Sequence, residues 1–147
     1  MKIEVDQSGR IEMAGDTVIA AADGFVVTVR VRAEVKMTVR DALKQLGVKT
    51  RMIMIRMFVG AIVMALRDNL RTIDSLTIDE EYIGYEAEIK SLLIDRLRSL
   101  DLQLDPHLIT VARVGKKSPA HHAAIRVTRK QVQADLTPTA TELLEMC

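Results

Sequence analysis

Hydrophobic and polar residues alternate at the start of the chain, which is typical of a strand with one buried face. Ile3 and Val5 are apolar and their neighbours are polar, so we predict a strand over residues 2–6. The Ser8-Gly9 pair that follows is typical of a turn. Asp6 is therefore expected at the end of this first strand.

A hairpin is the next predicted feature. Apolar residues indicate a second strand over residues 17–22, Asp23-Gly24 has the composition of a tight turn with positive φ angles, and a third strand is predicted over residues 25–35. Along the third strand, valines alternate with polar residues that include Arg30 and Arg32. One face of this strand is therefore expected to be polar and basic.

From Thr38 the spacing of apolar residues changes to that of a helix. Thr38 is predicted to cap a short helix that runs through Leu46, and Gly47 to end it. A long helix is then expected from Thr50 to Leu70. Because this helix is apolar nearly all round, it should be buried on two sides.

The next part of the chain predicts alternating strands and helices. A short strand over residues 75–79 ends at Asp79, and a helix beginning at about Gly84 carries an apolar stripe that should pack on the sheet. After Asp105-Pro106, a fifth strand is predicted over residues 107–114. The apolar stripe of the helix that begins at about Gly84 consists of Tyr85, Ile89, Leu92, Leu93 and Leu97.

Two capping patterns predict the last helices. Ser118-Pro119 combines an N-cap with proline at the first helical position, for a helix that ends near Thr128. Thr139 and Glu142 have the spacing of a capping box.

The resulting element order, βββαβαβα, predicts an α/β fold with a five-stranded mixed sheet and helices on its faces. An α+β layer with another strand order stays open. We expect one domain over residues 1–135 and a short C-terminal helix or tail over residues 136–147.

Composition narrows the functional classes. The chain has 147 residues and a formal net charge of +1, so it suits one domain, and any surface that attracts nucleic acid must be local. The N-terminus lacks the apolar core of a signal peptide, and residues 52–66 are too few to span a bilayer. The one cysteine, Cys147, allows no internal disulfide and suits a reducing compartment. We therefore expect a cytoplasmic protein.

Two aspartates at strand ends carry the candidate chemistry. Asp6-Gln7-Ser8-Gly9 after the first strand and Ile78-Asp79 at the end of the fourth, within this element order, resemble the ribonuclease H-like superfamily. That superfamily includes ribonuclease H, Holliday-junction resolvases and transposases. The resemblance implies that the first and fourth strands are parallel neighbours, which would bring Asp6 and Asp79 together. It also implies cleavage of phosphodiester bonds with Mg²⁺ or Mn²⁺ as cofactor.

The same resemblance implies further ligands from helices. The family often adds an acid from its first long helix, but residues 50–66 contain none, so this ligand is missing or supplied by Glu80 or Glu81. For a final ligand on the last helix the candidates are His121 and His122, and we choose His121 because it shares a helix face with Lys117. The predicted catalytic and metal-binding residues are Asp6, Asp79 and His121.

Basic residues predict how a substrate is held. Lys116 and Lys117 directly precede the helix start at Ser118, where ammonium groups and backbone amides converge on an anion. Together with Arg30 and Arg32 they are the predicted substrate-binding residues. Aromatic residues are only 3% of the chain, which favours contacts with the phosphate backbone over base stacking. The expected partner is nucleic acid, and no membrane partner is expected.

The leading hypothesis is a metal-dependent nuclease acting on structured or duplex nucleic acid. Each acid also has a structural interpretation, because Asp6 can cap a turn and Asp79 can precede a helix. One alternative is a catalytically inactive ribonuclease H-like module that binds nucleic acid or assembles proteins. Another is a homo-oligomer whose apolar helix, residues 52–66, lies at a subunit interface.

Overall fold

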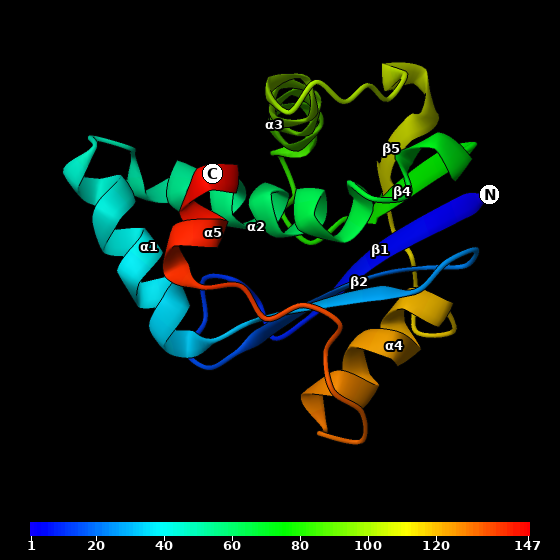
Figure 1. Cartoon of the computed structure of the whole chain (residues 1–147), viewed down its shortest axis with the longest axis horizontal. Coiled ribbons are helices and arrows are strands. Elements are labelled where there is room, and N and C mark those ends of the chain that lie inside the picture. The colour runs from blue at the N-terminus through cyan, green and yellow to red at the C-terminus, as the bar shows by residue number, and fades with distance from the viewer.

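The computed structural model describes all residues, 1–147, and contains a five-stranded mixed sheet with helices on both faces (Figure 1). The strands lie in the order β3-β2-β1-β4-β5. β1 is antiparallel to β2 and parallel to β4, β2 is antiparallel to β3, and β4 is parallel to β5. The strands are β1 Lys2–Ser8, β2 Thr17–Ala22, β3 Val27–Val31, β4 Ser75–Asp79 and β5 Ile109–Ala112. The predicted α/β class and mixed five-stranded sheet are confirmed.

Two layers of helices cover the sheet. α2 crosses one face and contacts α1, α3 and α5, whereas α4 packs on the opposite face against β1 and β2 (Figure 1). No helix is both long enough and apolar enough to span a membrane. The helices are α1 Ala33–Gln45, α2 Thr50–Leu66, α3 Glu86–Ser99, α4 Pro119–Thr128 and α5 Ala140–Met146, with short 3₁₀ turns at Leu70–Thr72 and Pro106–Leu108.

The alternation of side chains along the strands divides the core into two layers. Ile3 and Val5 belong to the main core with α2, in which residues 57–66 are all buried. On the other face Ala20 and Ala124 belong to a smaller cluster between β2 and α4. Because α2 is buried within a single chain, it does not offer the subunit interface that the homo-oligomer alternative required.

The boundary between β3 and α1 differs from the prediction. β3 ends at Val31 and α1 begins at Ala33, so Thr38 lies inside α1 and caps nothing. The physical reason is Asp16, in the loop before β2, whose Oδ1 atom accepts a hydrogen bond of 2.9 Å from the amide of Ala33. This carboxylate supplies the cap that the residue preceding α1 lacks.

Other predicted boundaries were also displaced. β1 continues to Ser8, two residues beyond Asp6, and α2 ends at Leu66 instead of Leu70. In the β2–β3 turn only Asp23 has a positive φ, of 89°, and Gly24 does not. Gly47, with a φ of 83°, separates two helices as its predicted role as a helix end requires, although the element order βββαβαβα counted them as one.

The region around α3 was predicted less well. α3 begins at Glu86 and packs mainly on α2, so the expectation that its apolar stripe lies on the sheet was wrong. β5 is restricted to Ile109–Ala112, because Asp105 accepts a hydrogen bond from the amide of His107 and starts a 3₁₀ turn there. The first difference arises because a neighbouring helix decides how α3 packs, and the second arises from a local cap.

The C-terminal segment belongs to the core. Leu136 pairs with Val29 of β3, and α5 places Leu143 in the main core against α1 and α2. α2 approaches α5 closely at Gly60, where an added Cβ would lie 3.3 Å from Sγ of Cys147. Burial raises the pKa of the Cys147 thiol to about 12.

Candidate metal centre

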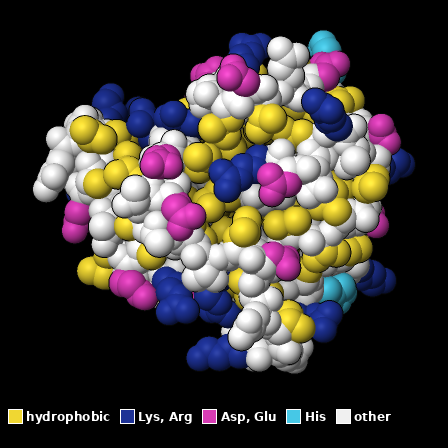
Figure 2. Space-filling view, viewed as in Figure 1, with side chains coloured by type: hydrophobic (Ala, Val, Ile, Leu, Met, Phe, Trp, Pro, Cys, Tyr) yellow, Lys and Arg dark blue, Asp and Glu magenta, His cyan; other side chains and the backbone are white.

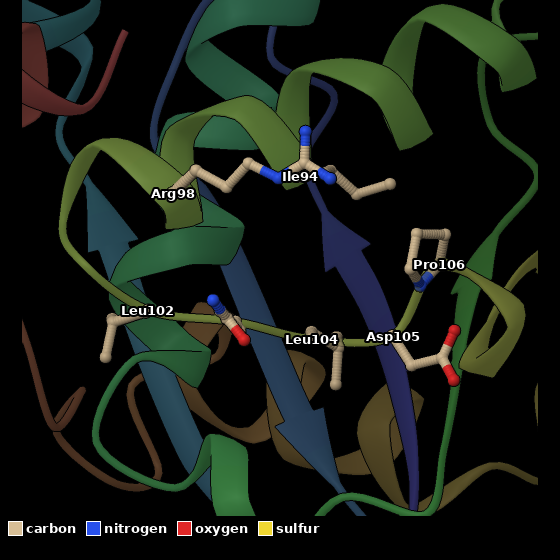
Figure 3. A pocket seen from close by; sticks show the side chains of 7 residues that line it. Ile94, Arg98, Leu102, Leu104, Asp105 and Pro106 are labelled. Carbon is tan, nitrogen blue, oxygen red and sulfur yellow. The ribbon is translucent and has the colours of Figure 1, made fainter.

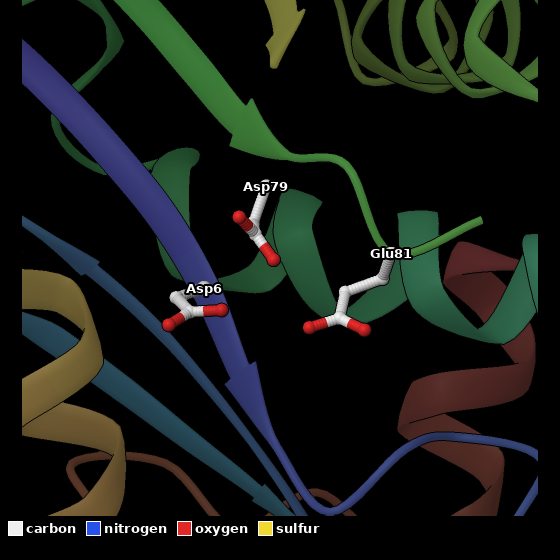
Figure 4. A group of neighbouring side chains, drawn as sticks. All are labelled: Asp6, Asp79 and Glu81. Atoms are coloured by element: carbon white, nitrogen blue, oxygen red, sulfur yellow. The ribbon is translucent and has the colours of Figure 1, made fainter. Parts of the chain in front are cut away.

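The register of the central strands brings Asp6 and Asp79 together. β1 and β4 run parallel, and Val5 is paired with Ile78. The next residue on each strand is an aspartate, and both aspartates therefore face the α4 side of the sheet. Figure 4 shows the two carboxylates on neighbouring strands, facing a common space.

Glu81 supplies a third carboxylate. Carboxylate oxygens of Asp6, Asp79 and Glu81 all lie within 4.8 Å of one another (Figure 4). The chain turns tightly after β4, where the amide of Glu81 donates to the carbonyl of Asp79 at 2.9 Å. Of the two acids that the sequence left open as replacements for a helix ligand, the structure brings Glu81 into the cluster and leaves Glu80 exposed.

Hydrogen bonds orient the two aspartates. Oδ1 of Asp6 accepts from the amide of Gln7 at 2.8 Å, and Oδ1 of Asp79 accepts from the amide of Val114 at 2.8 Å. Oδ2 of Asp6 lies 3.0 Å from Nδ1 of His121, and each carboxylate oxygen has a second lone pair for a further partner. The aspartates are therefore held in place by backbone groups and still offer ligand atoms.

Tyr82 anchors the segment that carries Glu81. Its buried hydroxyl accepts hydrogen bonds from Nε2 of Gln7 at 3.1 Å and from the amide of Ile11 at 3.3 Å. Its ring packs edge-on against Phe58 of α2, with ring centroids 5.1 Å apart. The guanidinium of Arg10 lies over the Tyr82 ring, 5.3 Å from its centroid, and donates to the carbonyl of Glu81 at 3.1 Å. The loop that carries Glu81 is therefore anchored to the rest of the protein and is not a free surface turn.

Burial and the neighbouring negative charge raise the pKa values of Asp6 and Glu81. Burial is the main cause of the raised pKa of Asp6, and the charge of Asp79 adds to it. The pKa of Glu81 is raised to about 7, first by burial and then by the hydrogen bond and the negative charge of Asp79. A divalent cation between these groups would favour their ionised forms.

His121 lies beside the cluster, not within it. It occupies the first turn of α4, whose start is capped by Ser118 Oγ accepting from the amide of Ala120 at 3.1 Å. Nδ1 of His121 is 3.0 Å from Oδ2 of Asp6. His122 is exposed and does not line the acidic site, so the choice of His121 over His122 agrees with their positions.

The three carboxylates and His121 line an open cleft of about 740 Å³, which we call the acidic cleft. Of the two lysines predicted to bind substrate, Lys116 lines this cleft and Lys117 does not. Arg113 also lines it. Sequence reasoning missed Arg113 because it fell inside the predicted strand 107–114, whereas in the structure it directly follows β5.

The structure does not bring Arg30 and Arg32 to the acidic cleft. Both line a separate hollow at the C-terminal end of α4. Arg30 there forms an ion pair with Asp16, with 2.8 Å between Nη1 and Oδ2. Arg30 lies on β3 as predicted, whereas Arg32 follows the end of that strand, and α4 lies between both arginines and the acids.

Another hollow lies beside α3. It measures about 340 Å³ and is formed by α3 and the loop that follows it (Figure 3). Arg98 and Asp105 are its only charged side chains. It holds no group of acids or histidines, so the candidate chemistry stays in the acidic cleft.

Comparison of the chain with protein-family models, with curated proteins and with solved structures finds no match. The geometry of the acidic cleft is therefore what points to a function.

Proposed function

We propose that this protein is a metal-dependent nuclease of ribonuclease H-like fold that cleaves phosphodiester bonds of structured or duplex nucleic acid. One observation carries the proposal: carboxylate oxygens of Asp6, Asp79 and Glu81 converge within 4.8 Å of one another. They do so in a cleft that also presents Lys116 and Arg113. Cleavage of a phosphodiester bond needs carboxylates that bind a cation and, beside them, positively charged side chains that bind a phosphate.

The three carboxylates fit Mg²⁺ or Mn²⁺. These cations prefer oxygen ligands, and in phosphate chemistry they are commonly held by one or two carboxylates and several waters. Burial first and then nearby negative charge raise the pKa values of Asp6 and Glu81, and a bound cation would offset both effects by stabilising the ionised carboxylates. When bound, the cation would polarise a phosphate oxygen and stabilise the charge that develops on it.

The chain's own residues would position the substrate and move a proton. Lys116 and Arg113 carry positive charge at the wall of the acidic cleft, where a phosphate would enter. Oδ2 of ionised Asp6 can only accept a hydrogen bond, so Nδ1 of His121 donates to it. Nε2 of neutral His121 then keeps its lone pair and can accept a proton from an attacking water.

The strand arrangement supports the ribonuclease H-like part of the proposal. The resemblance implies a first and a fourth strand that are parallel neighbours, and β1 and β4 are parallel neighbours in the middle of the sheet. The departure from the family pattern lies in the third acid. It comes from Glu81 in the loop after β4, because α2 contains no acid.

The test compares two double variants in Mn²⁺ on duplex DNA, RNA–DNA hybrid and branched DNA. We expect Asp6→Asn/Asp79→Asn to lose at least about 100-fold in cleavage rate, since even partners outside the ligand shell contribute about 10- to 100-fold. The matched control, Asp41→Asn/Asp95→Asn, removes two exposed acids on α1 and α3 and should cleave like the wild type. Equal cleavage by wild type and Asp6/Asp79 variant would refute the nuclease.

A catalytically inactive ribonuclease H-like module is the second candidate. The observation that favours it is the acid-free α2, which leaves the acidic cleft without the helix ligand that the resemblance implies. This module would bind nucleic acid equally well with and without a chelator. It would also cleave none of the substrates in Mn²⁺.

A further inference from the structure

The positive charge of this chain is concentrated in one continuous segment. Residues 107–134 contain six Lys and Arg residues and no Asp or Glu. The whole chain has 21 basic and 20 acidic residues, so the remainder of the chain is net acidic. The six are Arg113, Lys116, Lys117, Arg126, Arg129 and Lys130. A net charge near zero therefore conceals a strongly basic region.

This segment joins two separate hollows on the α4 side of the sheet. Lys116 lines the acidic cleft before α4 begins, and Lys130 lines the hollow at the other end of α4 together with Arg32. α4 has 10 residues and therefore spans about 15 Å. Figure 2 shows Lys and Arg side chains along the lower edge of the molecule, where Figure 1 places α4 and the segment after it, and others along the upper edge.

The hollow at the C-terminal end of α4 has free positive charge. Its one acid, Asp16, is already engaged, because Oδ2 pairs with Arg30 at 2.8 Å and Oδ1 accepts from the amide of Ala33 at 2.9 Å. Arg30 is also engaged, since Nη2 donates to the carbonyl of Val127 at 2.5 Å. The exposed side chains of Arg32 and Lys130 have no ion-pair partner.

The backbone holds Lys130 in position. Lys130 adopts a left-handed φ of 60° two residues after the end of α4, and its amide donates to the carbonyl of Val127 at 3.0 Å. This is the geometry of an ordered helix C-terminus. Lys130 therefore projects from a fixed turn into a hollow of about 640 Å³.

The lining residues favour phosphate over bases as the ligand. Neither the acidic cleft nor the hollow at the end of α4 is lined by Phe, Tyr or Trp, so no base-stacking surface is present. A duplex presents phosphates at regular intervals, with a rise of about 3.4 Å per step of each strand. The separation of about 15 Å along α4 thus corresponds to about four steps of a duplex.

We infer that the hollow lined by Arg32 and Lys130 is a second phosphate-binding site, which holds a nucleic-acid duplex that runs along α4 from the acidic cleft. The inference rests on the proposed function only in taking the duplex as the substrate of that cleft. Binding at the hollow requires neither metal nor cleavage. Binding at this hollow can therefore be tested in chelator, where no metal-dependent cleavage takes place.

The test measures binding of a labelled 20-base-pair DNA duplex by fluorescence anisotropy, in chelator, over a series of salt concentrations. Arg32→Gln/Lys130→Asn should weaken binding about 10-fold or more at low salt and reduce the slope of log K against log salt by about 2, since each lost phosphate contact contributes about 0.9. Asn at position 130 tolerates the left-handed backbone. Melting curves identify any variant that fails to fold, and Lys130→Asn alone, expected to change the slope by about 1, then replaces the double variant.

The matched control is Lys2→Gln/Arg71→Gln, which removes two exposed charges at the opposite end of β1 and β4. It should bind the duplex like the wild type. Any one of four results would overturn the inference. The first two are an equal loss of duplex affinity in both double variants and wild-type affinity in Arg32→Gln/Lys130→Asn. The other two are no duplex binding by the wild type and tighter binding of single strands than of duplex. Asp6→Asn/Asp79→Asn should still bind the duplex, so a failed nuclease assay is distinguishable from a failed phosphate site.

Discussion

Nδ1 of His121 lies 3.0 Å from Oδ2 of Asp6, although 115 positions separate the two residues in the chain. The contact exists because α4 crosses the face of the sheet on which β1 presents Asp6. It joins the first strand to the first turn of the helix that starts at Ser118. Two candidate residues from distant parts of the sequence thus form one hydrogen-bonded pair at the edge of the acidic cleft.

Replacing His121 tests whether this pair takes part in cleavage. His121→Ala should lower the cleavage rate about 10- to 100-fold, because a hydrogen-bonded partner of a metal ligand typically contributes that much. Mn²⁺ affinity, measured by calorimetry, should fall less than in variants of the carboxylates. His122→Ala is the control and should leave the rate unchanged, since His122 does not line the cleft. Equal rates for His121→Ala and the wild type would remove His121 from the site.

Replacing Glu81 tests the ligand that the loop supplies. Glu81→Gln should weaken Mn²⁺ binding at least about 10-fold, because a neutral amide replaces one of three clustered carboxylates. In chelator the same variant should melt at a higher temperature than the wild type, since it relieves repulsion with Asp79. Glu80→Gln is the comparison variant: Glu80 also lines the acidic cleft but lies outside the group of three carboxylates, so it should weaken Mn²⁺ binding less than Glu81→Gln. If Glu80→Gln weakens Mn²⁺ binding as much as Glu81→Gln, the assignment of the third carboxylate is wrong.

Lys36 should be the most stabilising charged residue on α1. Its side chain is buried, with 2% exposure, and Nζ donates to the carbonyl of Met13 at 2.7 Å and to Oγ1 of Thr17 at 3.0 Å. Lys36→Met removes these bonds and leaves buried acceptors without donors, so we expect a loss of about 2–4 kcal/mol in the free energy of unfolding. Urea denaturation measures it. Lys44→Met, exposed on the same helix, should change this free energy by less than about 0.5 kcal/mol.

Cys147 should make the protein less stable in alkaline solution. Burial raises the pKa of its thiol from 9.0 to about 12, so between these values the folded chain keeps a proton that the unfolded chain releases. The stabilisation is therefore complete below about pH 9 and is lost as the pH rises toward 12. Melting temperatures from pH 8 to 11 should fall more steeply for the wild type than for Cys147→Ala. Parallel curves would contradict a buried thiol.

Local sequence signals were sufficient for several elements. The predicted strand over residues 17–22 matches β2, the Ser118-Pro119 start gives α4, and Thr139 with Glu142 forms the predicted capping box. β4 likewise ends at Asp79 as predicted. In each case the determining interactions lie within a few residues of one another, so the sequence alone contains them.

Long-range contacts decided the rest. α1 begins at Ala33 because Asp16, far from it in the chain, caps it, and no local pattern near Thr38 indicates this. Arg30 and Arg32 lie away from the acids because α4 packs across the sheet between them. The sequence determined by itself that Asp6 and Asp79 end or nearly end two strands. Only the tertiary structure, through parallel pairing of these strands and the turn after β4, decided that Glu81 completes the cluster.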